Sequence, residues 1–143
     1  MTSSSLNPVL LTMREAVEAS GLSEDTLRYY EKLGLVMPER IPSSNHRRYS
    51  EQQIRWLKFL MHLRSTGMPL EKIQRYVQLV LQGEASAPQR KAILQEHQEQ
   101  VQAQMAKLQE ALRAINLKLH HYEEIEKALS AGMLQEARRS TLD

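Results

Sequence analysis

The fold of this chain is decided by the stretch Ser23-Glu-Asp-Thr-Leu-Arg-Tyr-Tyr-Glu-Lys-Leu33 and by Asn45-His-Arg-Arg-Tyr-Ser50, which follows it. Ser23 can cap a helix, and the first stretch then turns three apolar side chains to one face: Leu27, Tyr30 and Leu33. The side chains outside that face include Thr26, Arg28, Tyr29 and Lys32. An apolar back and a cationic, hydrogen-bonding front are typical of a helix that enters a DNA groove, so we interpret the two stretches as a DNA-reading helix and a basic wing.

A shorter helix is predicted just before the DNA-reading helix. Thr12 can cap it, it runs from Met13 to about Ser20, and Gly21 supplies the turn before Ser23. Two short helices around a glycine turn form a helix-turn-helix.

Turn-forming residues follow the DNA-reading helix. Gly34 ends it, and Pro38 and Pro42 interrupt any further helix, which leaves room for a two-stranded wing around residues 39–49. Asn45 tolerates the left-handed backbone conformation that such a turn needs.

Two more helices are predicted to complete a head over residues 11–83, after a disordered leader over residues 1–10. Ser50 and Gln53 match a capping box for a third helix that stops at Gly67. Pro69 suits the first turn of a fourth helix, which closes near Gly83.

A seven-residue apolar repeat runs through residues 84–131 and predicts a coiled-coil helix. Its seam consists of Leu94, Val101, Met105, Leu108, Leu112, Ile115, Leu119 and Tyr122. At a rise of about 1.5 Å per residue, this seam is too long to be buried against so small a head. The alternative is a helix that folds back on its own head. A second copy of the chain is the simplest partner, which predicts a homodimer. Residues 132–143 are expected to form a short tail.

Positive charge is concentrated in the head. The formal net charge is +2, but the segment from Arg28 to Arg64 holds eight basic residues against three acidic ones. This local excess favours a polyanionic partner such as DNA, although a solvated surface can have the same composition.

Composition excludes several classes of function. The chain has no cysteine, which excludes disulfides, thiolate metal sites and thiol redox switches. No apolar run approaches the roughly 20 residues of a membrane span, and no signal-like segment precedes the first helix, so we expect a cytoplasmic protein. No active-site motif occurs, so we expect no enzyme and no cofactor. His120 and His121 cannot hold one metal ion together, because adjacent helical residues point about 100° apart, and His120 with Glu124 supplies at most two ligands. A solvated helical face is therefore expected here rather than a metal site.

Four linked motifs resemble the MerR (mercury-resistance-regulator) family of bacterial transcription regulators. They are Leu11-Thr-Met-Arg-Glu-Ala16, Gly21-Leu-Ser-Glu-Asp-Thr-Leu-Arg-Tyr-Tyr-Glu-Lys-Leu-Gly-Leu35, Arg47-Arg-Tyr-Ser50 and Leu63-Arg-Ser-Thr-Gly-Met-Pro-Leu-Glu-Lys-Ile73. The resemblance covers residues 11 to about 80. It implies an all-α fold with a small β wing, in which a winged helix-turn-helix head precedes a long dimerisation helix that forms an antiparallel coiled coil.

The resemblance also implies roles for residues of the head. Tyr29 and Tyr30 match a tyrosine pair that contacts phosphates in relatives, although periodicity makes Tyr30 mainly a core residue whose hydroxyl could still reach a phosphate. Arg47 matches a wing arginine, and Arg64 falls where relatives carry a cation near the operator centre. The candidate DNA-binding residues on helix and wing are Thr26, Arg28, Tyr29, Tyr30, Lys32, His46, Arg47, Arg48 and Arg64.

The family mechanism implied by the resemblance is control of DNA shape. Relatives bind as symmetric dimers to promoters whose spacer is too long for RNA polymerase, and an effector changes the dimer so that the DNA is bent and underwound. The expected partners are promoter DNA, a second copy of the chain, RNA polymerase and, where an effector exists, a small molecule. We place a candidate effector cleft between the head and the end of the partner's coiled coil, near Trp56, Phe59 and Tyr76. Trp56 and Phe59 at this spacing are also typical of core residues.

Two other classes of protein stay open. An architectural DNA-binding protein of the excisionase type shares the winged head but does not need so long a seam. A coiled-coil adaptor for proteins explains the seam but not the basic wing or the exposed front of the DNA-reading helix.

Overall fold

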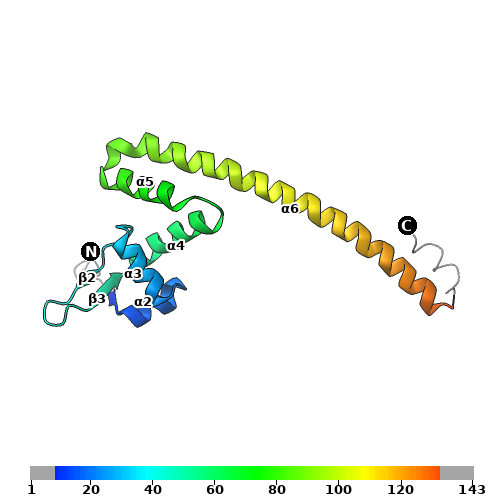
Figure 1. Ribbon diagram of the computed structural model, residues 1–143, viewed down its shortest axis with the longest axis horizontal. Helices are drawn as coiled ribbons and strands as arrows, with labels where there is room; N and C mark the ends of the chain where they lie inside the picture. The colour runs from blue at the N-terminus through cyan, green and yellow to red at the C-terminus, as the bar shows by residue number, and fades with distance from the viewer. Residues whose placement is uncertain (1–8, 133–143) are drawn as a thin grey trace, which may run out of the picture. The chain divides into compact units, whose positions relative to one another are not determined.

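The computed structural model describes residues 9–132, which are mostly helical and include one small sheet (Figure 1). The chain divides into two compact units, one ending at His97 and one beginning at Gln98. In chain order the elements are β1 (Leu10–Leu11), α2 (Met13–Ser20), α3 (Glu24–Lys32), β2 (Glu39–Arg40), β3 (Arg47–Ser50), α4 (Glu51–Ser65), α5 (Leu70–Leu81), the 3-10 helix η1 (Glu84–Ser86) and α6 (Ala87–Ser130).

Side-chain caps begin both helices of the helix-turn-helix. The Thr12 hydroxyl accepts a hydrogen bond from the backbone N–H of Glu15, whose carboxylate accepts one from the backbone N–H of Thr12. Gly21 ends α2 in the left-handed conformation, at φ 76°, and Ser23 caps α3 by accepting from the N–H of Thr26. The predicted helix-turn-helix is therefore confirmed.

The sheet has three antiparallel strands in the order β1-β3-β2, whereas two were predicted. Leu10 pairs with Ser50 and Leu11 with Tyr49, so the predicted leader, placed over residues 1–10, overlaps a strand at Leu10. A strand of two residues is too short to show an alternating pattern, which is why sequence periodicity missed it. The rest of the predicted leader, residues 1–8, lies outside the described residues, as do residues 133–143 of the predicted tail. The turn between β2 and β3 places Asn45 at φ 61°, in the left-handed region expected for it.

The two helices that complete the head begin as their sequences indicate, with one shift. Ser50 and Gln53 form the predicted capping box of α4. Pro69 occupies the N-cap of α5 rather than its first turn. Its ψ of 147° is extended, while its carbonyl already accepts from the backbone N–H of Ile73, and these are the properties of an N-cap residue.

One hydrophobic core joins α2, α3, β3, α4 and α5. Its fully buried side chains include Ala16, Leu27, Tyr49 and Leu57. Because each of these elements contributes to the same core, α3 and the wing are held on one rigid support.

The first turns of α6 belong to the head, and the remainder forms the second unit. Ile93 and Leu94 are half-buried against the core of the head, and Glu96 forms an ion pair with Lys72 of α5. The heptad repeat predicts that Leu94 is part of the seam for a second copy, whereas here Leu94 packs against its own head. A heptad pattern does not distinguish packing on the same chain from packing on a second chain. Among residues 9–132, no helix is long and apolar enough to cross a membrane.

Candidate nucleic-acid interface

The two faces of α3 differ in burial. Leu27 is fully buried, whereas Arg28, Tyr29 and Lys32 are exposed. Thr26 is half-buried, and its hydroxyl oxygen accepts a hydrogen bond of 2.9 Å from the Ser23 hydroxyl. The head therefore supplies the apolar contacts of α3 and leaves its cationic face to solvent.

Arg28 is paired locally. Its guanidinium forms an ion pair with Glu24 one turn earlier on α3, and both side chains are about half exposed. An exposed pair of this kind contributes at most about 1 kcal/mol, because water screens the charges. A phosphate or a base edge can therefore replace Glu24 as the partner of Arg28 at little cost.

Tyr30 belongs to the core, as its position on α3 predicted. The side chain is 8% exposed, and its hydroxyl donates to the sulfur of Met61 at 3.6 Å. The phosphate contact suggested for Tyr30 by the resemblance stays a prediction, and the exposed Tyr29 is the more accessible of the two rings.

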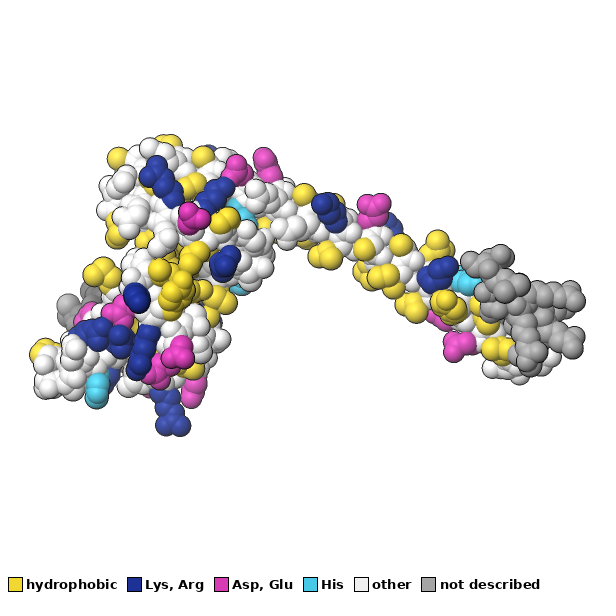
Figure 2. All heavy atoms as spheres, in the orientation of Figure 1, with side chains coloured by type: hydrophobic (Ala, Val, Ile, Leu, Met, Phe, Trp, Pro, Cys, Tyr) yellow, Lys and Arg dark blue, Asp and Glu magenta, His cyan; other side chains and the backbone are white. Residues whose placement is uncertain are grey.

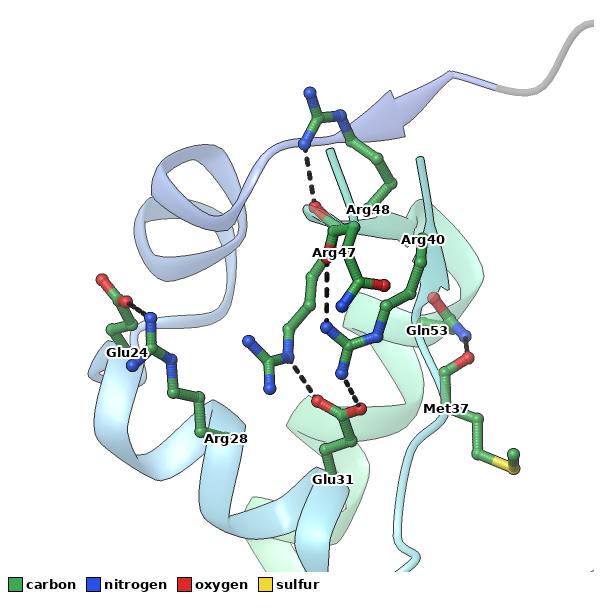
Figure 3. Close-up of polar contacts among 9 residues, drawn as sticks. Glu24, Arg28, Glu31, Met37, Arg40, Arg47, Arg48 and Gln53 are labelled. Atoms are coloured by element: carbon green, nitrogen blue, oxygen red, sulfur yellow. Dashed lines mark hydrogen bonds and ion pairs between the residues drawn. The ribbon is translucent and has the colours of Figure 1, made fainter. Parts of the chain in front are cut away.

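The wing is tied to α3 by a single carboxylate. Figure 3 shows Arg40 and Arg47 reaching from the wing strands toward Glu31, which lies in the last turn of α3. One carboxylate oxygen pairs with Nε of Arg47, and the other pairs with Arg40 at 2.7 Å. Arg40 also donates to the backbone carbonyl of Asn45 at 3.2 Å. Arg48, the next residue of β3, donates instead to the carbonyl of Arg47 at 3.0 Å.

Glu31 stays ionised because of these partners. Burial alone would raise the pKa of its carboxyl, but the hydrogen bonds and charges of Arg47 and Arg40 outweigh burial and lower the pKa below its usual 4.5. The same charge lies near Tyr49 of β3, and burial followed by the charge of Glu31 raises the pKa of that phenol.

A hollow of ≈ 840 Å³ lies between α2, α3 and the wing. Four basic side chains line it: Arg14, Arg28, Arg47 and Arg48. His46 from the turn lines it as well. Figure 2 shows that Lys and Arg side chains gather over this part of the head, with acidic side chains among them. The structure thus brings four of the predicted DNA-binding residues, on helix and wing, to one concave surface.

The other predicted DNA-binding residues do not line this hollow, and sequence reasoning missed some residues that do. Those outside the hollow are Thr26, Tyr29, Tyr30 and Lys32 on α3, and Arg64. Arg64 is at the end of α4, where it is exposed and donates to the carbonyl of Met68 at 3.4 Å. Sequence reasoning missed Arg14, which follows the cap of α2, and the bridging role of Glu31. The only signal for the bridge was an acidic residue in the last turn of α3, next to Lys32 and ahead of a basic wing. A count of charges treats such a residue only as an opposing charge.

A second, apolar cleft of ≈ 770 Å³ lies on another part of the head. Trp56, Phe59 and Tyr76 line it, with ring centroids 6.1 to 6.4 Å apart. The indole N–H of Trp56 donates to the carbonyl of Leu35 at 2.8 Å, which orients the ring. Among the described residues, no group of three or more His, Asp or Glu side chains is placed to hold a metal ion.

The predicted seam of α6 is exposed from Met105 onward. The solvent-exposed side chains are Met105, Leu108, Leu112, Ile115, Leu119 and Tyr122, while Val101 is half-buried. Figure 2 shows hydrophobic side chains along this helix. A soluble helix does not usually leave such a stripe in water, so the stripe indicates a surface for a partner helix.

Comparison with known proteins matches both parts of this architecture. The family model for MerR HTH family regulatory proteins matches residues 11–79, and the model for the MerR DNA-binding region matches residues 54–116. The chain is 31% identical over 120 residues to an uncharacterized HTH-type transcriptional regulator of Haemophilus influenzae, covering 84% of this chain and 88% of that protein. It is 34% identical over 131 residues to the uncharacterized regulator YyaN of Bacillus subtilis, covering 83% of this chain and 95% of YyaN.

A solved structure shares the fold as well. HiNmlR, a MerR family regulator lacking the sensor domain and solved bound to promoter DNA, superposes with a TM-score of 0.78 at 29% identity. The match covers 90% of this chain and 96% of the HiNmlR chain. With two family models, two relatives above 30% identity and this fold in agreement, the chain belongs to the MerR family of helix-turn-helix transcriptional regulators.

Proposed function

We propose that the chain binds double-stranded promoter DNA as a homodimer and controls transcription by changing the shape of that DNA. The observation that carries the proposal is the basic hollow, in which the exposed face of α3 and the wing meet. The likeness to HiNmlR, whose structure holds promoter DNA, supports the same use of this surface. Such a regulator acts without catalysis, in the cytoplasm where chromosomal promoters lie.

Residues of the interface divide into base readers and phosphate contacts. Arg28 and Thr26 lie on the helix that enters the major groove, where an arginine can pair with the edge of a guanine. Tyr29, Lys32 and the wing residues His46, Arg47 and Arg48 contact the phosphate backbone and fix the register of the head. Arg64 contacts a phosphate near the operator centre.

Dimerisation follows from the exposed seam of α6. A copy of the same helix running antiparallel buries Leu108 and Leu112 at its centre and places two heads at separate half-sites. Two heads joined at a fixed separation can hold DNA in a bent, underwound form, which changes how RNA polymerase engages the promoter.

The apolar cleft is the site proposed for an effector. Its three aromatic rings suit an apolar or aromatic small molecule. Trp56 is the only tryptophan of the chain, so its fluorescence reports occupancy of the cleft directly. A small apolar compound that quenches this fluorescence in the wild type, and that binds Phe59→Ala at least tenfold more weakly, would support the assignment. An affinity that the substitution leaves unchanged would refute it.

In vitro selection tests the main proposal. The full-length protein is incubated with a library of random duplexes, and the recovered duplexes are bound again at several salt concentrations. We expect enrichment of an inverted repeat and a linear fall of log affinity with log salt, because phosphate contacts release counterions. Recovery of no sequence, together with binding that ignores salt, would favour the coiled-coil adaptor.

A further inference from the structure

We propose that Glu31 is a positioning residue that raises the sequence specificity of DNA binding by fixing two wing arginines, at the expense of affinity for DNA in general. The inference rests on the proposed DNA-binding function and adds a role for an acidic residue within a basic surface. An isolated carboxylate there would only repel the phosphate backbone, so its presence needs an explanation.

The geometry makes Glu31 a bridge rather than a local partner. Its two oxygens each hold a different arginine, Arg40 from β2 and Arg47 from β3. The three side chains are 22% to 34% exposed, whereas the Arg28 and Glu24 side chains are 53% and 49% exposed. Partial shielding from water strengthens an ion pair and restricts its side chains, so the bridge holds its arginines more firmly than the local pair holds Arg28.

Strand register gives the bridge a second reason to exist. Arg40 and Arg47 are directly opposite each other in the β2 and β3 pairing. Like charges at such a position destabilise an antiparallel pair. The carboxylate of Glu31 lies between them and cancels this repulsion, so it keeps the two wing strands together while it ties them to the end of α3.

This arrangement has opposite effects on the two kinds of DNA binding. Arginines released from Glu31 can contact the phosphates of any DNA, which raises the affinity for every sequence. Arginines held by Glu31 meet phosphates only when α3 is seated in the DNA groove, because contacts to the backbone set the register of the base contacts. Glu31 therefore selects the seated complex over the loosely bound one.

The test compares Glu31→Gln with Glu24→Gln in the full-length protein. Both substitutions remove one negative charge from α3 and one carboxylate partner of arginine, but only Glu31 connects α3 to the wing. Affinities are measured for a duplex selected from a random library by the wild type and for a scrambled duplex of the same composition. If the wild type selects no sequence, the proposed function fails before the role of Glu31 is examined.

For Glu31→Gln we expect affinity for the scrambled duplex to rise about threefold to tenfold, with a salt slope steeper by about one to two, because freed arginines contact additional phosphates. The ratio of selected to scrambled affinity should fall at least tenfold. For Glu24→Gln both affinities should rise together, leaving the ratio within about twofold of the wild type. A parallel rise in both affinities for Glu31→Gln would mean that charge alone acts, and would overturn the proposal.

Glu31→Asp keeps the charge and shortens the side chain. We expect it to lower the specificity ratio at least threefold, although its net charge equals that of the wild type. If Glu31→Gln and Glu31→Asp instead weaken binding to both duplexes equally, Glu31 only supports the fold and the proposal is wrong.

Discussion

His97, in the third turn of α6, lies with its Nε2 2.7 Å from the hydroxyl oxygen of Thr66, which follows the last residue of α4. The Thr66 hydroxyl donates its only proton to the backbone carbonyl of His62 at 2.6 Å, so its oxygen is available to accept from the N–H of His97. Among residues 9–132, the buried polar or charged residues are Ser86 and His97. This contact attaches the first turns of α6 to the head.

Replacement of His97 is therefore expected to weaken the head itself. His97→Ala removes a buried ring and its hydrogen bond, for which we expect a loss of about 1 to 3 kcal/mol in the free energy of unfolding. Urea denaturation at a fixed protein concentration measures the change, because the stability of a dimer depends on concentration. His120→Ala, at an exposed position on the same helix, is the control. Equal effects of the two substitutions would contradict a structural role for His97.

The features that sequence predicted are local ones. The caps at Thr12, Ser23 and Ser50 involve partners three residues away, and the buried positions of α3 recur within one turn. Backbone geometry alone fixes such spacings, so composition and periodicity suffice to find them. The winged helix-turn-helix and the long helix were predictable for this reason.

The features that sequence missed join distant parts of the chain. Glu31 and Arg47 are 16 residues apart, Lys72 and Glu96 are 24 apart, and Thr66 and His97 are 31 apart. No repeating pattern marks such pairs, because they depend on how the helices pack in three dimensions. The bridge that organises the candidate DNA-binding site belongs to this class, and so does the attachment of α6 to the head.

Substitution of Leu108 should separate the proposed dimer. Leu108 is mid-seam and 70% exposed in the single chain, and truncation of a buried leucine typically costs about 2 to 5 kcal/mol. Leu108→Asp adds a charge to a dry interface, so we expect monomers by light scattering and loss of binding to an inverted repeat. Leu117→Asp makes the same change at a residue that is 73% exposed and outside the heptad seam, so it should leave the dimer intact. A stable dimer of the Leu108 variant would rule out the seam as the interface.

Arg28 and Arg47 should affect DNA binding in different ways. If Arg28 reads a base edge, Arg28→Ala should cost about 1 to 3 kcal/mol and relax the preferred sequence at one position of each half-site. Arg47→Ala should weaken binding to the selected duplex and reduce the salt slope of that binding by about one, because Arg47 contacts a phosphate once α3 is seated in the groove. Its effect on the scrambled duplex should be smaller, because Glu31 holds Arg47 away from the backbone of loosely bound DNA. Titrations with both duplexes at three or more salt concentrations separate the two outcomes. Wild-type binding by both variants would show that this surface is not the DNA reader.

Acid should remove the stability that Glu31 contributes. Burial opposes ionisation of its carboxyl, but Arg47 and Arg40 lower its pKa in the folded protein below the usual 4.5. A carboxyl with a lowered pKa stabilises the fold fully above 4.5, and the contribution is lost as the pH falls through the lowered pKa. The difference in unfolding free energy between wild type and Glu31→Gln should therefore be constant near neutral pH and shrink below about pH 4.5.

Denaturant titrations at a series of pH values measure this difference, and other carboxyl groups largely cancel because they titrate in both proteins. Repeating the comparison in an Arg47→Ala background supplies the control. With one of its two arginine partners gone, Glu31 should contribute less to the free energy of unfolding at neutral pH. The part of that contribution that is lost on acidification should be correspondingly smaller. A difference between wild type and Glu31→Gln that grows on acidification would have the wrong sign for a carboxylate paired with arginines, and would contradict the bridge between α3 and the wing.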